Sequence, residues 1–346
     1  MTNKIRWGVI GSGGIARRRT IPEGIVSAKN ADLSVVFDID PDANKAVADE
    51  FHARPVSSMK ELLSTNIDAV YIATPAHVHC RHVLDSAKAG KHILCEKPLG
   101  LTVDEAESMR NACKSEGVLL GIAMMMRFQS QHQTALAMVR EGAIGKLVYG
   151  RAQLSCWYPI MDNAWRQDPV LGGGGSLIDM GGHCIDLLEM FFGRITKVSC
   201  MVNNSVHSYV SEDSAVVIMS FEIGAMASVD TYFCIPDESS KNRLELYGSK
   251  GSILAQNTIG QGEAGEMIAY LQEENSDYDA RQKRTDHGGI AISPKPVNMY
   301  RAEIEDFSNA VLENREPLIH AQLGIHNQQI LAACYESART GSTITV

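Results

Sequence analysis

The chain has 346 residues, which is enough for two domains that each bury a hydrophobic core. Hydrophobic residues make up 45% of the chain and charged residues 21%, as in ordinary globular proteins. The net charge of -9 gives no reason to expect nucleic acid or an anionic membrane as a partner. The first residues are too polar for a signal peptide, and no apolar stretch reaches the roughly 20 residues of a membrane helix. The eight cysteines form no C-x-x-C pair, so we expect a cytoplasmic, reducing environment.

Residues 1–125 alternate short apolar runs with amphipathic stretches, which is the pattern of β-α-β units. The run A-V-Y-I-A is apolar on both faces, as expected of a parallel strand buried on both sides. Thr102 and Glu105 have the spacing of a capping box at a helix start. The expected strands are Ile5–Gly11, Leu33–Asp38, Asp68–Ala73, His92–Glu96 and Leu119–Ala123, and the expected helices are Pro41–Phe51, His77–Ala89 and Thr102–Glu116. These residues therefore predict an α/β domain with a parallel sheet.

A glycine-rich segment, G-S-G-G-I-A, follows the first strand and opens a helix. In this context Gly11 permits a tight turn, Gly13 lets the backbone approach a diphosphate, and Ala16 is small enough for close helix–strand packing. The diphosphate would lie on the amides at the helix N-terminus. The expected contacts are Gly11, Ser12, Gly13, Gly14 and Ile15. Because Pro22 lacks an N–H, we expect this helix to break there and a second short helix to begin.

Two strand ends carry further candidate cofactor contacts. The carboxylate of Asp38, at the end of the second strand, can accept hydrogen bonds from ribose hydroxyls and would repel a 2′-phosphate. This favours NAD over NADP, although Asp38 could instead be a surface acid in a turn that also contains Asp40 and Asp42. Thr74 and Pro75 end the next buried strand and should line the nicotinamide side, because ligands bind outside the carboxyl ends of such strands.

After Arg127 the pattern changes to longer β-rich runs, which predicts an α+β domain built on a large, mostly antiparallel sheet in residues 126–346. The runs are Lys146–Trp157, Arg194–Asn203, Asp213–Glu222, Ala225–Phe233 and Arg243–Gly248, and the helices are Ser176–Phe192, Tyr300–Leu312 and Gln322–Thr340. The Gly-rich, charged residues Gln256–Pro296 predict a long excursion or mobile loop. Because Ala215–Phe221 is apolar on both faces, we expect one sheet face to pack against a second subunit, in a homodimer or homotetramer.

Two segments contain residues suited to acid–base chemistry. Lys97, in C-E-K-P, follows a buried strand, so its ammonium faces the ligand edge of the sheet and can stabilise a developing alkoxide. Asp179 and His183 are four residues apart, which places them on one helix face, and a histidine beside carboxylates suits proton transfer near neutral pH. Taken alone, Glu96–Lys97 is more often a surface ion pair and D-x-x-x-H more often part of a buried helix. Together, after a nucleotide-binding pattern, they favour catalysis.

These segments resemble, in order, those of the glucose–fructose oxidoreductase / inositol dehydrogenase (Gfo/Idh/MocA) family. The matching motifs are G-S-G-G-I-A, A-T-P-A-H-V-H, C-E-K-P, W-R-Q-D-P, G-G-G-S-L-I-D-M-G-G-H-C-I-D and L-E-L-Y-G-S-K-G. The resemblance implies a Rossmann domain followed by an open-sheet domain that supplies substrate contacts and oligomer interfaces. It implies an NAD(P)-dependent dehydrogenase that acts on sugars, cyclitols or related polyols.

The resemblance also implies roles for individual residues. His183 would be the acid/base, Lys97 would hydrogen-bond the substrate oxygen, and Asp179 would orient both substrate and base. The expected substrate contacts are Lys97, Arg127, Trp165, Arg166, Asp179 and His183, and His79, Glu96 and Lys97 are expected to complete the cofactor contacts. Relatives often carry polar residues where Met124–Met126 precede Arg127. We favour core packing for these methionines, which otherwise would make the pocket less polar.

Three alternatives stay open at this point. His77, His79, Cys80 and His82 could bind a metal, but His77 and His79 lie on different helix faces, so we expect none. The chain could be an NAD-binding regulator without catalysis, because a fold does not fix a function. Some relatives break glycosidic bonds through transient oxidation by bound NAD, and the same residues would begin that reaction.

Overall fold

The computed structural model describes residues 4–272, 280 and 288–346. Spatial proximity divides the chain into two compact units. The first consists of Met1–Met125, Met161–Gly182 and Asn298–Ala332, and the second consists of Met126–Ile160, His183–Val297 and Ala333–Val346. Each unit therefore contains segments from well-separated parts of the chain, and each has a sheet of its own.

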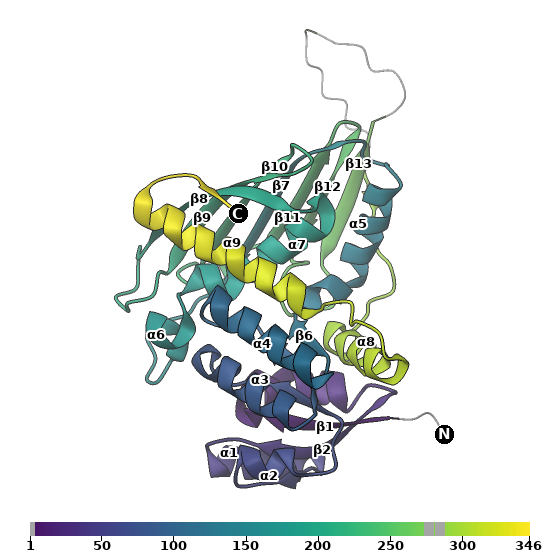
Figure 1. Cartoon of the computed structure of the whole chain (residues 1–346). Helices are drawn as coiled ribbons and strands as arrows, with labels where there is room; N and C mark the ends of the chain where they lie inside the picture. The colour runs from purple at the N-terminus through teal and green to yellow at the C-terminus, as the bar shows by residue number, and fades with distance from the viewer. Residues whose placement is uncertain (1–3, 273–279, 281–287) are drawn as a thin grey trace. The chain divides into compact units, whose positions relative to one another are not determined.

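The first unit contains a six-stranded parallel sheet in the order β3-β2-β1-β4-β5-β6 (Figure 1). Its strands are β1 (Ile5–Ile10), β2 (Ala31–Phe37), β3 (Arg54–Pro55), β4 (Ala69–Ile72), β5 (His92–Glu96) and β6 (Leu120–Ala123). All four residues of β4 are buried, as its continuous apolar run predicts. This confirms the expected α/β fold with a parallel sheet, and the short edge strand β3 is an addition to the five strands expected.

The helices of this unit, apart from α3, begin at side-chain caps. They are α1 (Pro41–Phe51), α2 (Met59–Leu63), α3 (His79–Lys88), α4 (Val103–Glu116), α6 (Pro169–Gly172) and α8 (Met299–Glu313). At α4, Thr102 Oγ1 accepts the Glu105 N–H at 3.2 Å, which confirms the predicted cap. The Glu105 carboxylate accepts the N–H of Leu101 at 2.7 Å rather than that of Thr102, so the capping box is displaced by one residue.

The helical segment after β1, Ser12–Ile25, corrects the prediction of a break at Pro22. Its non-helical residue is Gly14, with φ -85° and ψ -122°, and the segment continues through Pro22. The hydrogen bonds are of the wide π type, as in Val26 N–H to Ile21 O at 2.9 Å. In such a ladder the missing Pro22 N–H removes one bond without ending the helix.

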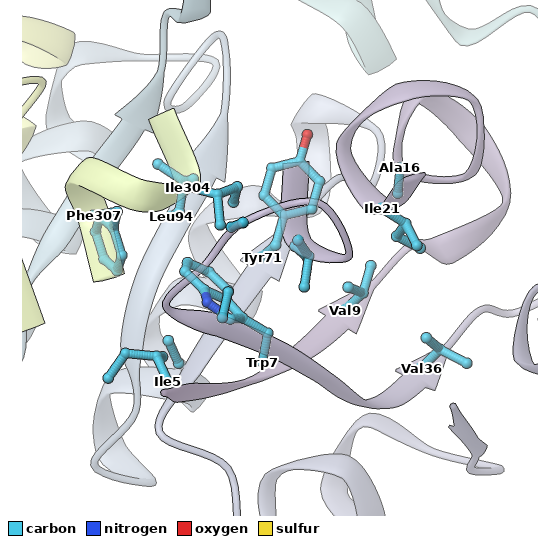
Figure 2. Close-up of a cluster of buried hydrophobic side chains, with 14 of the residues drawn as sticks. Ile5, Trp7, Val9, Ala16, Ile21, Val36, Tyr71, Leu94, Ile304 and Phe307 are labelled. Carbon is cyan, nitrogen blue, oxygen red and sulfur yellow. The ribbon is translucent and has the colours of Figure 1, made fainter. Parts of the chain in front are cut away.

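The apolar core of the first unit combines its sheet with a helix from late in the sequence. Trp7 of β1 is fully buried, and its ring centroid lies 5.5 Å from that of Phe307 on α8 (Figure 2). The indole Nε1–H donates to Ser308 Oγ at 3.2 Å, so its polar group is satisfied inside the core. Ile304 of α8 joins the same cluster. This packing explains why Asn298–Ala332 belong to the first unit.

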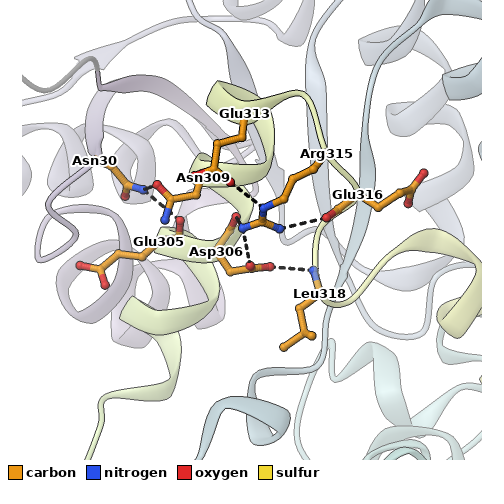
Figure 3. A network of polar contacts seen from close by, with 8 residues as sticks. All are labelled: Asn30, Glu305, Asp306, Asn309, Glu313, Arg315, Glu316 and Leu318. Atoms are coloured by element: carbon orange, nitrogen blue, oxygen red, sulfur yellow. Dashed lines mark hydrogen bonds and ion pairs between the residues drawn. The ribbon is translucent and has the colours of Figure 1, made fainter.

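Polar contacts fix the end of α8 and the loop that follows it (Figure 3). The Asp306 carboxylate accepts hydrogen bonds from Arg315 at 2.9 Å and from the backbone N–H of Leu318 at 2.7 Å. Asn30, just before β2, donates to the Glu305 carbonyl at 2.9 Å and to Asn309 Oδ1 at 2.7 Å. The start of β2 and α8 are thereby joined.

The second unit contains a nine-stranded sheet in the order β14-β13-β12-β11-β7-β10-β9-β8-β15. Its strands are β7 (Leu147–Ser155), β8 (Ile195–Asn203), β9 (Ser214–Phe221), β10 (Met226–Tyr232), β11 (Arg243–Gly248), β12 (Gly251–Gln256), β13 (Glu266–Leu271), β14 (Ile290–Ala291) and β15 (Ile344–Thr345). The β7–β10 pair is parallel and the other pairs are antiparallel, which confirms the expected, mostly antiparallel sheet.

The predicted excursion Gln256–Pro296 is wrong in part, because it contains β13 and β14. The segment Glu266–Leu271 alternates buried and more exposed side chains, so its hydrophobic pattern supports a strand despite the charged flanks. Residues 273–279 and 281–287, which also fall in the predicted mobile loop, lie outside the described residues.

One face of the second sheet is covered by helices. The helices here are α5 (Ser130–Arg140), α7 (Gly182–Phe192) and the end of α9 (Ala321–Thr340). Phe192 of α7 stacks on Phe221 of β9, with centroids 5.0 Å apart. The expected single helix Ser176–Phe192 is instead a π-helical turn, Leu177–Gly181, followed by α7. Among the described helices, none combines the length and apolarity needed to cross a membrane.

Candidate active site

The glycine-rich turn after β1 has the geometry that its glycines predict. Gly11 has a φ of +84°, and a Cβ there would lie 2.8 Å from the backbone of Ala73 and Thr74. A side chain is therefore excluded on two grounds, which confirms the tight turn. A Cβ on Gly14 would meet no atom within 4 Å, so the backbone there is open to a ligand. No acidic residue lies in the first turn of the helix, which leaves its positive end free to attract an anion.

Asp38 follows β2 directly and faces this turn. Its Oδ2 accepts the N–H of Gly13 at 2.8 Å, and its Oδ1 accepts the N–H of Asp40 at 3.0 Å. These two bonds fix the carboxylate while using only part of its capacity of about four lone-pair sites. Hydrogen bonds from ribose hydroxyls to the remaining sites stay a prediction.

The strand end Thr74–Pro75 and the segment after β5 are joined by His79. One imidazole nitrogen lies 2.8 Å from the Thr74 carbonyl oxygen and the other 2.9 Å from that of Pro98. The ring is buried, and burial lowers its pKa. His79 therefore contacts two loops at the carboxyl edge of the sheet. A direct contact between His79 and a cofactor stays a prediction. Thr74 Oγ1 also contacts His82 Nδ1, at 3.1 Å.

Three charged side chains meet next to β5 in the first unit. The Lys97 ammonium donates to the Asp179 carboxylate and to the Asp179 carbonyl oxygen, both at 2.6 Å. Arg166 Nε donates to the same carboxylate oxygen at 3.0 Å. Burial favours the neutral acid, yet the positive charges of Arg166 and Lys97 hold the pKa of Asp179 far below its ordinary range. Asp179 is therefore an anion between two cations.

Arg166 is itself held by Trp165, because its guanidinium carbon lies 4.2 Å from the indole ring centroid. Gly172 permits this arrangement. A Cβ at that position would lie 3.1 Å from the Trp165 carbonyl oxygen and 3.2 Å from Arg166 Cα. The glycine run thus lets the W-R segment approach, as its sequence suggests. The bond from Arg166 to Asp179 was not expected, since no spacing rule links residues 13 apart in a loop.

Behind the Lys97 backbone lies a buried polar chain that sequence reasoning missed. Thr20 Oγ1 donates to the Tyr71 hydroxyl at 2.9 Å, and that hydroxyl donates to Glu96 Oε1. Glu96 Oε2 accepts the N–H of Lys97 at 3.2 Å. Burial raises the pKa of Glu96, while Tyr71 and Lys97 oppose this rise. Tyrosine in an apolar strand gives little sign in a sequence that its hydroxyl has a buried carboxylate partner.

In the second unit, His183 is the second residue of α7 and is largely buried. One helical turn later, Asp186 forms an ion pair with Arg127. Arg127 Nε lies 2.9 and 2.8 Å from the two carboxylate oxygens, and both side chains are nearly buried. The guanidinium therefore anchors the helix that carries His183. A direct contact between Arg127 and substrate stays a prediction.

Met124, Met125 and Met126 are all buried, which confirms the interpretation that they pack in the core. Across the described part of the chain, no group of three or more histidine, cysteine or acidic side chains is arranged to hold a metal ion.

Comparison with known protein families agrees with the motifs. The NAD-binding Rossmann-fold model of the Gfo/Idh/MocA oxidoreductase family matches residues 5–124, and the C-terminal domain model of the same family matches residues 132–254. The chain belongs to this family. It is therefore an oxidoreductase with an NAD-binding Rossmann domain, as the resemblance implied.

Known relatives match this oxidoreductase over nearly its full length. The 1,5-anhydro-D-fructose reductase of Ensifer adhaerens is 25% identical over 99% of this chain and 98% of its own. The D-xylose 1-dehydrogenase (NADP(+)) 2 of Haloferax volcanii is 28% identical over 98% of each chain. Among solved structures, the aldose-aldose oxidoreductase from Caulobacter crescentus complexed with glycerol superposes with a TM-score of 0.86, is 25% identical, and covers 99% of this chain and 100% of its own.

Proposed function

We propose that the protein transfers a hydride, in a reversible reaction, between a nicotinamide cofactor and a secondary alcohol or ketone of a sugar, cyclitol or related polyol. The cofactor accepts or donates the hydride at C4 of its nicotinamide when bound. The protein holds the carbinol, moves its proton and stabilises the charge on its oxygen. Substrate oxidation leaves a ketone, a reduced cofactor and a proton.

The Lys97–Asp179–Arg166 cluster carries this proposal. A lysine at the carboxyl end of a Rossmann strand is bonded at 2.6 Å to a carboxylate, and that carboxylate precedes His183 by four residues. An ammonium fixed in this way is a preorganised hydrogen-bond donor, which stabilises an oxyanion most effectively when it needs no reorganisation. A purely structural ion pair would not require a histidine four residues further along the sequence or the glycine-rich turn.

Each residue of the site has a separate role in this proposal. We assign His183 as the acid/base that takes or returns the hydroxyl proton, and Lys97 as the donor to the substrate oxygen. Asp179 orients both, and Arg166 with Trp165 offers hydrogen bonds and an apolar ring face to a polyol. Arg127 contributes through Asp186 and α7.

For the cofactor we propose NAD. The turn at Gly11 and Gly14 fits a diphosphate, because one position cannot hold a side chain and the other lies open. The fixed Asp38 carboxylate suits free ribose hydroxyls and opposes a 2′-phosphate. The proposed contacts also include Ser12, Gly13, Ile15, Thr74, Pro75, His79 and Glu96. Because one relative is named for NADP, both cofactors belong in the assay.

We further propose that residues 1–125 bind the cofactor, that residues 126–346 hold the substrate and the subunit interface, and that the enzyme works in the cytoplasm. The interface would be the uncovered face of the second sheet, where Val216 and Ile218 of β9, Met201 of β8 and Met226 of β10 are exposed. Exposed apolar side chains on neighbouring strands favour association with a second copy of the chain.

The test is an absorbance screen for reduced cofactor with NAD and NADP across aldoses, inositols, anhydro-sugars and glycosides. With an accepted substrate, Lys97→Met should reduce kcat by at least about 10²-fold, the loss typical of one oxyanion donor, while NAD still binds. Lys91→Met is the matched control. Lys91 lies at the other end of β5 and donates to the carbonyls of Thr65 and Ile67.

The outcomes separate the alternatives. Wild-type turnover in Lys97→Met would contradict the proposed role of the lysine. Glycoside cleavage without net NADH would favour transient oxidation, and NAD binding without turnover of any polyol would favour a regulator.

A further inference from the structure

A continuous hydrogen-bond chain links the helix after the glycine-rich turn to the backbone of Lys97. It runs from Thr20 in the segment Ser12–Ile25 through Tyr71 in β4 to Glu96 at the end of β5. The second Glu96 oxygen accepts the N–H of Lys97. Tyr71 and the Lys97 backbone thus meet at one partly buried carboxylate, beside the lysine that the site depends on.

We infer that Thr20, Tyr71 and Glu96 are positioning residues for Lys97, and that Tyr71 keeps Glu96 an anion next to the charged site. This inference rests on the proposed function, because it assigns Lys97 the role described above. It adds a partly buried acid and its hydrogen-bond donors to the residues that determine the pH range of the reaction.

The charges around Lys97 balance only when Glu96 is ionised. Lys97 and Arg166 bring two positive charges to Asp179, which brings one negative charge. Both cations also act electrostatically on Glu96 and favour its ionised form. With Glu96 ionised the charges of the four side chains sum to zero, and with Glu96 neutral these partly exposed side chains carry a net positive charge. A buried set of charges is stable when it is paired and hydrogen-bonded.

The Tyr71 hydroxyl also favours an ionised Glu96. The tyrosine is fully buried, and its ring belongs to the apolar cluster around Trp7, with the hydroxyl on the side away from the indole (Figure 2). A phenylalanine would fill the same space, so packing alone does not require the oxygen. Burial, and after it the negative charge of Glu96, raise the pKa of Tyr71, which therefore acts as a neutral donor to the carboxylate.

Other charged groups face this pair. Tyr300 of α8 lies close enough to Glu96 for burial and that negative charge to raise the pKa of its phenol. The Arg19 guanidinium lies 5.7 Å from the Tyr300 ring centroid, and Glu23 and Glu303 also act on Tyr300. The Tyr300 hydroxyl is buried and makes no hydrogen bond among the described residues. Tyr300 therefore offers a matched control, a second buried tyrosine near Glu96 whose hydroxyl has no hydrogen-bond partner in the described part of the chain.

The experiment compares Tyr71→Phe with Tyr300→Phe. Removing the Tyr71 donor raises the pKa of Glu96 further, so Glu96 should remain protonated to a higher pH. Infrared titration follows the protonated-carboxyl band of Glu96, which is assigned because it is absent in Glu96→Gln. In Tyr71→Phe this band should persist to a pH about one unit higher than in the wild type. A shift of that size corresponds to the loss of one hydrogen bond to a charged group. The acidic limb of the kcat/KM profile should shift in the same direction.

Two further variants keep the test decisive if Tyr71→Phe folds poorly. Thr20→Val, at the far end of the chain, should give a smaller shift of the same sign, and Thr20→Ser should follow the wild-type profile. The inference is overturned if Tyr71→Phe or Thr20→Val superposes on the wild type, or if Tyr300→Phe shifts as much. If Lys97→Met leaves turnover intact, the proposed function fails. If Lys97→Met is inactive but Tyr71→Phe has the wild-type pH profile, only this inference is overturned.

Discussion

At the scale of single residues, the site depends on whether His183 is the proton carrier. We predict that His183→Ala lowers kcat by about 10²–10⁴-fold, the loss typical of removing a general acid/base. Its neighbour Asp186 pairs with Arg127 and holds the helix independently of the imidazole, so the variant should fold. Steady-state kinetics, with circular dichroism to check folding, measure this. Turnover equal to wild type would remove His183 from the role.

A second residue-scale prediction concerns cofactor choice. Asp38→Ala removes the carboxylate that Gly13 and Asp40 hold in place, and with it the proposed bonds to the ribose hydroxyls. Hydrogen bonds to a charged group are worth about 1.5–3 kcal/mol, so kcat/KM for NAD should fall by about 10–100-fold. The value for NADP should fall less or rise, because the repulsion of its phosphate is gone.

Asp42→Ala is the control for this change, since Asp42 lies in α1 two residues beyond the cap of that helix. An unchanged ratio of NAD to NADP in Asp38→Ala would show that Asp38 acts only within its turn, as the alternative interpretation of the sequence holds.

The sequence predicts the position of some of these residues but not the partners of others, for a physical reason. Gly11 and Asp38 could be placed because strand–turn–helix geometry ties their function to local spacing. Tyr71 and Arg166 could not be assigned their partners, because Tyr71–Glu96 and Arg166–Asp179 contacts form between elements that are distant along the chain. A side chain's type limits which bonds it can make, and only the packing of elements decides which it does make.

At the scale of elements, His132 at the start of α5 should make stability depend on pH. Its Nδ1 contacts the Met126 carbonyl at 2.9 Å, the ring is fully buried, and burial lowers its pKa from 6.5 to about 4. Above pH 6.5 the ring is neutral in both states. As the pH falls below that value, the unfolded chain binds a proton that the folded chain does not, so the free energy of unfolding decreases toward pH 4.

We therefore predict that the free energy of unfolding falls less for His132→Leu than for the wild type between pH 7 and pH 4. The two decreases should differ by roughly 2–3 kcal/mol, since each pKa unit corresponds to about 1.4 kcal/mol. Some slope should remain, because burial also lowers the pKa of His82 to about 4. Urea unfolding across this pH range measures the difference, with His77→Leu, at an exposed position, as control. Parallel curves for His132→Leu and wild type would contradict the assignment.

Elements differ in how far their sequence determines them. The apolar face of α8 predicts that it buries a surface, yet nothing local indicates that Phe307 meets Trp7 in the first sheet. The π-helical segments Ser12–Ile25 and Leu177–Gly181 have the composition of ordinary helices, so a prediction from propensity and proline alone misplaces their irregularities. Strand β13 was missed because its charged flanks outweighed its short alternation.

At the scale of the whole molecule, the uncovered face of the nine-stranded sheet should determine the assembly. Ile218 and Val216 project from the middle of β9 and are 58% and 42% exposed, whereas Val217 and Met219, on the other face, are buried. The same open face also carries Tyr149, which pairs with Tyr247, and Arg151, which is bonded to Asp230. Tyrosine, arginine and methionine beside aliphatic side chains are typical of the centre of a protein interface.

We predict that Ile218→Arg dissociates the assembly, because it would bury an unpaired charge at the centre of the contact. Sedimentation velocity at micromolar concentration should show wild-type protein as a dimer or tetramer of the 37.7 kDa chain and Ile218→Arg as the monomer. Val210→Arg is the control, because Val210 is 77% exposed but lies outside the strands of the sheet. A monomeric wild type would rule out the interface, and an undisturbed oligomer of Ile218→Arg would place it on another surface. Val217 and Met219 need no partner in either case, since they are already buried within the single chain.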